Sequence, residues 1–194
     1  MSLHDAAERN DVAALKRLLA AGAQLDARDD RGRTPLLAAT HANAVDAARL
    51  LIEARADVNA KDAIQDSPYL YAGARGHLEI LKLTLAHGAD LKSTNRFGGT
   101  ALIPAAERGH VDTVRTLIAT GVAVDHVNRL GWTALIEAVI LADGGPRHVE
   151  IVQLLLQAGA DPNLPDKDGV TPLAHARQRG FREMVSLIEA AGGR

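Results

Sequence analysis

The residues of this chain that could do chemistry are histidines and carboxylates, and they recur at a fixed spacing. His77 and His110 lie about 33 residues apart, and the same interval, which is long enough to be a repeat period, separates Asp57 and Asp90. Imidazole and carboxylate groups can bind a metal ion or transfer a proton. A zinc site, however, needs ligands clustered at short spacing, and the chain has no cysteine. Side chains that return once in every such interval are instead typical of structural positions in a repeating unit.

Signals for catalysis are weak in the rest of the chain. A catalytic site needs a nucleophile, a base and an orienting group that converge in one pocket, and no motif supplies that set. The run Gly144-Gly145-Pro146 falls between two predicted helices, not at the strand–helix junction of a phosphate loop. We therefore predict a protein that is not an enzyme, with no catalytic residue, no cofactor and no metal. The remaining histidines outside the recurrent position, predicted to be surface residues, include His41, His87, His126 and His175.

The composition and net charge of the chain limit the classes of partner that it can bind. The 22 basic and 24 acidic residues give a net charge of −2, so we expect neither nucleic acid nor a membrane as a partner. No apolar run approaches the ~20 residues of a membrane span. The segment from Met1 to Glu8 lacks the basic start and apolar core of a secretory signal, which predicts a cytoplasmic protein. Export remains an alternative, because a leader removed from the chain would leave no trace.

One sequence motif is repeated along the chain, and the elements that it forms must position these side chains. A hydroxyl residue opens each copy, at three equal steps and a longer fourth one: Thr34, Ser67, Thr100, Thr133 and Thr171. A second landmark advances by the same steps: Gly22, Arg55, Gly88, Gly121 and Gly159. Such a period predicts a solenoid, whose units bury a core only by stacking on their neighbours. The extra residues of the last interval are predicted to form a surface loop at 142–147, between two helices, because insertions in solenoids collect in loops.

A single copy can be interpreted as a turn followed by two short helices. Residues 95–99 have the glycines of a tight turn, and Thr100 stands where a helix N-cap belongs. Gly109 is expected to end the first helix. The second helix carries an apolar stripe at helical spacing, and Gly121 closes it in the left-handed conformation. The members of the stripe are Val111, Val114, Leu117 and Ile118.

Three motifs in register resemble the ankyrin-repeat family. They are Thr34-Pro35-Leu36-x-x-Ala39, Gly76-His77-Leu78-Glu79, and a Gly-Ala-Asp-hydrophobic-Asn motif that appears as Arg55-Ala56-Asp57-Val58-Asn59. The resemblance covers essentially the whole chain and is of a bacterial type. It implies an all-α ankyrin-repeat solenoid of helix-turn-helix units joined by β-hairpin-like finger loops. It also implies protein partners that lie across the fingertips and the concave row of first helices.

The repeat predicts a single domain, residues 1–194, built from six units. The boundaries are about 1–28 for an N-terminal capping repeat, 29–61, 62–94, 95–127 and 128–165 for internal repeats, and 166–194 for a C-terminal capping repeat. Ser2, with Asp5 three residues later, is a candidate N-cap for the first helix. We expect a monomer.

The candidate site comprises residues that the repeat itself does not require. The fingertips carry Phe97, Leu130 and Trp132 with Arg96 and Arg129, and Trp and Arg are enriched in interface hot spots. Apolar tips could instead pack on the neighbouring finger, and for Leu130 both interpretations stay open. Tyr71 and Glu137 occupy the groove-facing position of the first helices. The predicted contact set is Tyr71, Arg96, Phe97, Glu107, Arg129, Leu130, Trp132 and Glu137.

The sequence thus predicts a non-catalytic protein–protein interaction module that binds a partner protein through the groove and fingertips. The alternative is a small-molecule or metal-binding protein with a pocket under the middle fingers. The third repeat departs most from the others. Arg55 and Gln65 replace glycines, and we predict a positive φ at Arg55, at a cost of about 1 kcal/mol.

Overall fold

The computed structural model describes all residues, 1–194, and contains twelve helices and no strand, which confirms the all-α prediction. The chain divides into two compact units. The N-terminal unit comprises residues 1–73 and 77–96, and the C-terminal unit comprises residues 74–76 and 97–194. Whether the whole chain is a single domain stays a prediction.

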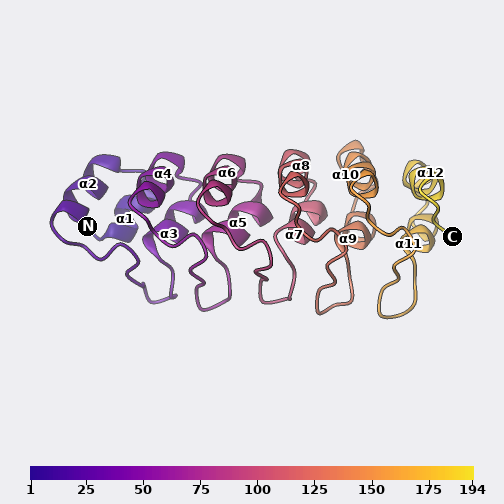
Figure 1. Cartoon of the computed structure of the whole chain (residues 1–194), viewed down its shortest axis with the longest axis horizontal. Helices are drawn as coiled ribbons and strands as arrows, with labels where there is room; N and C mark the ends of the chain where they lie inside the picture. The colour runs from indigo at the N-terminus through magenta and orange to yellow at the C-terminus, as the bar shows by residue number, and fades with distance from the viewer. The chain divides into compact units, whose positions relative to one another are not determined.

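The N-terminal unit contains three helix pairs. Within it the first helices of the pairs form one row and the second helices another, and the loops before α3 and α5 project from one side (Figure 1). Helix α1 packs on α2 and α3, and α4 packs on α2, α3 and α6. The helices are α1 (Leu3–Glu8), α2 (Val12–Ala20), α3 (Pro35–His41), α4 (Val45–Glu53), α5 (Pro68–Arg75, whose last residues belong to the other unit) and α6 (Leu78–Ala86).

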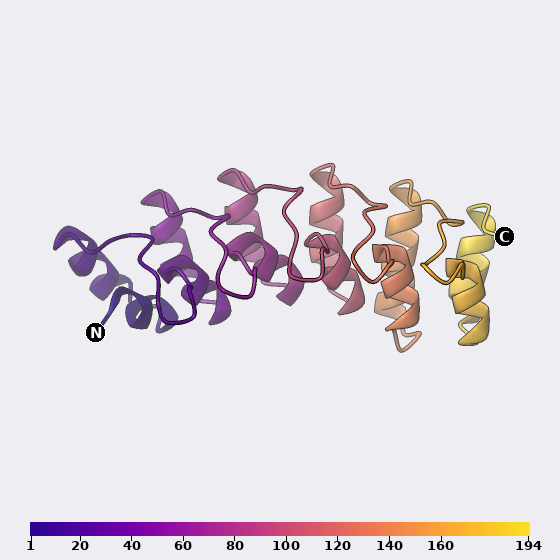
Figure 2. The same ribbon diagram turned by 90° about the horizontal axis from the view of Figure 1, so that it is seen from below.

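The C-terminal unit repeats this arrangement, and Figure 2 shows its loops from below. Helix α9 packs on α7, α10 and α11, while α10 packs on α8 and α12. The helices are α7 (Leu102–Glu107), α8 (Val111–Ala119), α9 (Ala134–Ile140), α10 (Pro146–Gln157), α11 (Pro172–Gln178) and α12 (Arg182–Ala190). In both units the core is mostly leucine, isoleucine, valine and alanine, and the small alanines let the short helices approach closely.

Hydroxyl caps begin most of the first helices, as predicted. The side chains of Thr34, Ser67, Thr133 and Thr171 each accept a hydrogen bond of 3.2 Å from the backbone N–H three residues later. At the amino terminus, Ser2 and Asp5 form the reciprocal bonds of a capping box. These bonds use N–H groups that a helix cannot satisfy internally.

Thr100 is the exception, and its predicted capping role is wrong. Its hydroxyl is buried without a hydrogen-bond partner, and α7 starts only at Leu102. The cause is Pro104. In the other repeats the residue at this position donates its N–H to the carbonyl of the hydroxyl residue, as Glu137 does to Thr133 at 3.0 Å. Proline has no N–H to donate, so the first turn of α7 is displaced.

This difference predicts opposite results for one substitution at two positions. Thr133→Val should lower the free energy of unfolding by about 1 kcal/mol, because it removes a working cap. Thr100→Val should leave it unchanged or raise it, because it removes only an unpaired buried hydroxyl. Both hydroxyl residues are 2% exposed, so burial does not distinguish them. Urea denaturation of the two variants checks this, and equal losses would contradict it.

The prediction of a positive φ at Arg55 is confirmed. Its φ is 77°, and Gln65, which also replaces a glycine, has a φ of 68°. The four equivalent glycines have φ between 79° and 90°, and a Cβ built on any of them would meet nothing within 4 Å. A side chain at this position is therefore strained by its backbone angle and not by a clash.

Arg55→Gly should consequently stabilise the protein by up to about 1 kcal/mol, since glycine adopts positive φ without steric cost. The measurement is the midpoint of thermal or urea unfolding compared with the parent protein. A lower midpoint for the glycine variant would contradict the assignment of strain to this residue.

The extra residues near 142–147 lie between two helices, as predicted, but they do not all form a surface loop. Helix α10 begins at Pro146 and has 12 residues where α8 has 9, so part of the insertion lengthens a helix. Ala142 is buried, and its carbonyl accepts a hydrogen bond of 2.7 Å from Arg179. A Cβ on Gly144 would lie 2.6 Å from the ring of Phe181. The segment therefore packs against the last repeat.

Candidate protein-binding surface

The conformation of the finger at residues 128–132 is set by Asn128. Its side-chain oxygen accepts from the backbone N–H groups of Leu130 at 2.9 Å and Trp132 at 3.1 Å. Its own backbone N–H donates to the carbonyl of Trp132 at 3.0 Å. Asn128 is buried, while Arg129 and Leu130 are exposed, so this turn holds its polar centre inside and presents the next two side chains to solvent.

Two fingertips of the C-terminal unit are joined through their backbones. The N–H of Arg129 donates to the carbonyl of Phe97 at 2.9 Å. The ring of His126 donates from Nε2 to the carbonyl of Gly98 at 2.7 Å. Phe97 and Leu130 are 48% and 40% exposed, which makes them two of the few large apolar side chains left in solvent. The prediction that His126 is a simple surface residue is wrong, because it is half-buried and links these fingers.

Trp132 differs from its neighbours in being half-buried. Its backbone is held on Asn128, and the next residue, Thr133, caps α9. A tryptophan in this position can contribute both to packing within the finger and to contact with a partner. Its role in binding therefore stays a prediction.

Glu137, expected to line the groove, is buried at 5% exposure. Its Oε1 accepts a hydrogen bond of 2.8 Å from the side-chain amide of Asn128. Burial, and secondarily the charge of half-buried Glu107, raise the pKa of Glu137 to about 7, against the opposing effects of the Asn128 hydrogen bond and Arg108. The carboxyl group therefore lies behind the finger, where it braces Asn128.

The two remaining predicted contact residues belong to the N-terminal unit. Tyr71 is half-buried on α5, and its ring stacks on that of His41, with centroids 3.9 Å apart and an interplanar angle of 18°. His77 meets the same ring edge-on at 6.0 Å. His41 is therefore half-buried in an aromatic cluster, and the prediction that it is a simple surface residue is wrong. Arg96 is exposed.

Among the recurrent histidines, His77 has the structural role that its spacing predicts, and His148, which follows the insertion, has the same role. Nδ1 of His77 donates to the carbonyl of Thr40 at 2.9 Å, and Nε2 of His148 donates to the carbonyl of Glu107 at the same distance. Each bond connects two repeats. His175 is also half-buried, against the surface prediction, and bonds Asp166 at 2.7 Å. No group of three or more histidine, aspartate or glutamate side chains is placed to hold a metal ion.

Asn128 fixes the shape of the finger, a role that was not predicted from the sequence. The signal is present, because the first position of every finger holds an Asp or Asn: Asp29, Asp62, Asn95, Asn128 and Asp166. An acceptor that recurs there is the turn chemistry that Asn128 performs.

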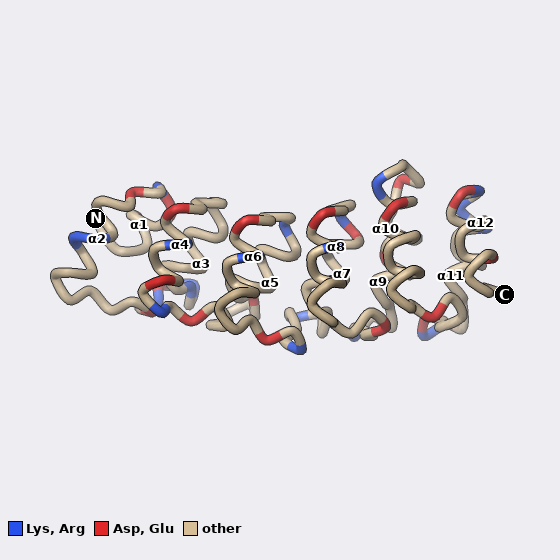
Figure 3. The backbone as a smooth tube through the Cα atoms, turned by 45° about the horizontal axis from the view of Figure 1, so that its top comes forward, with Lys and Arg blue, Asp and Glu red and all other residues tan.

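Charges of both signs are interspersed along each unit in Figure 3. Exposed ion pairs such as Arg115–Glu150, at 2.6 Å, bring opposite charges together on α8 and α10. None of the twelve helices combines the length and the apolar character that a membrane span requires.

Paired short helices, capped by hydroxyl residues and separated by finger loops at a fixed period, define a helical repeat protein of the solenoid class. A family model described as ankyrin repeats in three copies matches residues 69–166, and one described as ankyrin repeats in many copies matches residues 3–52. The chain belongs to the ankyrin-repeat family. Ankyrin repeats are generally protein-interaction modules, and the family is generally non-enzymatic.

Solved structures share this fold over the full length. An ankyrin repeat domain of Acinetobacter baumannii AYE is 64% identical, with a TM-score of 0.96 over 99% of this chain and 98% of that one. The ankyrin repeat protein EF0377 is 43% identical, with a TM-score of 0.93 over 97% of this chain and 96% of that one. The putative ankyrin repeat protein YahD of Escherichia coli K12 is 57% identical over 56 residues, which span 29% of this chain and 28% of that protein.

Proposed function

We propose that this chain is a non-catalytic module that binds a partner protein, and that the fingertips of its C-terminal unit are the centre of the contact. The observation that carries this proposal is the pair Phe97 and Leu130. Both are exposed, and both lie on fingers joined by the bond between Arg129 N–H and the Phe97 carbonyl. Exposed apolar side chains on two joined fingers, with an arginine next to one of them in the sequence, have the composition of an interface core.

Rigidity of the fingers supports the same proposal. The backbone around Leu130 is held by the buried side chain of Asn128, which is itself bonded to Glu137. A surface whose turns are already fixed loses little conformational entropy when a partner binds. Tyr71 and Arg96 belong to the proposed contact set as residues of the N-terminal unit. Glu107 also stays in the set, whereas buried Glu137 contributes mainly by supporting the finger through Asn128. We also propose that the protein is a monomer and that it acts in the cytoplasm.

The test is capture from a lysate of the source organism, followed by titration of the purified partner. We expect Arg129→Ala with Leu130→Ala to lose the partner that the parent protein captures. Leu141→Ala is the matched control, because Leu141 is a similarly exposed leucine of the same unit, at 48%, outside the fingers. A partner held equally by both variants would place the interface elsewhere.

A further inference from the structure

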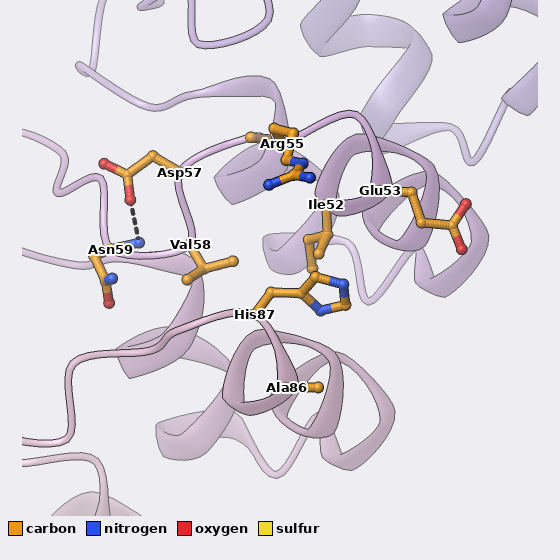
Figure 4. Close-up of a pocket in the computed structure, with 9 residues that line it drawn as sticks. Ile52, Glu53, Arg55, Asp57, Val58, Asn59, Ala86 and His87 are labelled. Atoms are coloured by element: carbon orange, nitrogen blue, oxygen red, sulfur yellow. Dashed lines mark hydrogen bonds between the residues drawn. The ribbon is translucent and has the colours of Figure 1, made fainter.

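The N-terminal unit contains a cavity away from the fingertips, where α4 and α6 end. Its volume is about 790 Å³, and it opens to solvent. Figure 4 shows the side chains around it. The residues that line it are Ile52, Glu53, Arg55, Ala56, Asp57, Val58, Asn59, Ala86 and His87. A volume of this size lies in the range of small-molecule sites, roughly 300–1,000 Å³.

Two departures from the repeat meet at this cavity. Two residues directly follow the second helix of each repeat. In four repeats neither of them is ionisable: Ala21-Gly22, Thr120-Gly121, Ala158-Gly159 and Ala191-Gly192. Only here do they hold ionisable side chains, Arg55 after Ala54 and His87 before Gly88. Both contribute to the lining. The backbone of Arg55 has a left-handed conformation, which strains a residue that carries a side chain but not a glycine. Backbone strain of this kind clusters at functional positions.

The side chains of Arg55 and His87 are available to a ligand, whereas the two carboxylates of the lining are turned aside. Figure 4 shows the guanidinium of Arg55 extending toward the space between Val58 and Ile52, while the carboxylate of Glu53 points away. Asp57 faces its own loop and accepts from the N–H of Asn59 at 2.8 Å. His87 donates from Nδ1 to the carbonyl of Leu83 at 2.8 Å, which leaves Nε2 for another partner.

We propose that this cavity binds a small oxyanion, a carboxylate or a phosphate monoester, that carries a short apolar group. The planar fork of Arg55 matches the paired oxygens of either anion. Nε2 of His87 supplies a second donor when both ring nitrogens carry a hydrogen. The buried side chains of Ile52 and Val58 form an apolar floor for the rest of the ligand. This site is independent of the fingertips and of the partner protein proposed above.

The test titrates the isotopically labelled full-length protein with inorganic phosphate, with butyrate and with sodium chloride at matched ionic strength. We expect saturable NMR shifts of Arg55 and His87 with a Kd below about 1 mM for at least one oxyanion. Saturation by phosphate alone assigns a phosphate ligand, and saturation by butyrate assigns a carboxylate. Shifts no larger than those with chloride would overturn the proposal.

Two variants distinguish the effect of the Arg55 guanidinium on binding from the effect of relieving backbone strain. Arg55→Gly should weaken binding at least about tenfold, although the variant is expected to be the more stable protein. Gln65→Gly is the matched control, because it relieves the same kind of strain at a residue outside the cavity, and its affinity should equal that of the parent. Equal affinities for the two variants would overturn the proposal, since Arg55 would then hold no ligand.

Discussion

Replacing Glu137 by glutamine is expected to raise the free energy of unfolding by on the order of 3 kcal/mol at about pH 8, and to change it little near pH 4. Burial, with the charge of Glu107, raises the pKa of Glu137 in the folded protein from 4.5 to about 7. The folded state therefore binds this proton more tightly than the unfolded state does. Its contribution is present below about pH 4.5 and is lost as the pH rises through 7.

Denaturation at a series of pH values measures this effect. The parent protein should lose stability between about pH 4.5 and 7, whereas Glu137→Gln, whose amide oxygen can still accept from Asn128, should lose much less. Glu150→Gln is the control, because that carboxylate is exposed in an ion pair with Arg115. A difference between parent and Glu137→Gln that stays constant across this window would contradict the raised pKa.

Much of the fold could be predicted because the repeat constrains it locally. The hydroxyl caps and the positive φ at Arg55 each depend on a few consecutive residues, so comparison of one repeat with the next reveals them. Thr100 shows where that comparison fails. The residue that decides its capping is Pro104, which lies one turn later and occupies a position otherwise assigned to the groove.

The candidate site could be predicted only in part, because burial depends on contacts between repeats. The exposed positions of Phe97 and Leu130 follow from their place at the tips of the turns. The burial of Glu137 does not, since it requires Asn128 to fold back over α9. The role of His126 could not be predicted either, because no other repeat has a histidine at the equivalent position. Only the structure shows that its partner is the carbonyl of Gly98 in the preceding finger.

The largest effect on function is expected at Trp132. Trp132→Ala should weaken binding of a true partner by at least about 2 kcal/mol, or about thirtyfold, while changing the free energy of unfolding far less. The reason is its place beside Arg129 and Leu130 on a finger whose backbone is fixed by Asn128. A large, rigid side chain in that position gains contact area at little entropic cost.

Calorimetric titration of the captured partner, together with an unfolding curve for each variant, distinguishes binding from packing at Trp132. Lys82→Ala is the control for affinity, because Lys82 is an exposed residue of α6 paired with Glu79. It should bind as the parent does. Since Trp132 is half-buried, its truncation could instead loosen the finger. A Trp132→Ala protein that binds normally but unfolds at a lower urea concentration would show that the ring stabilises the finger and that the partner contacts other residues.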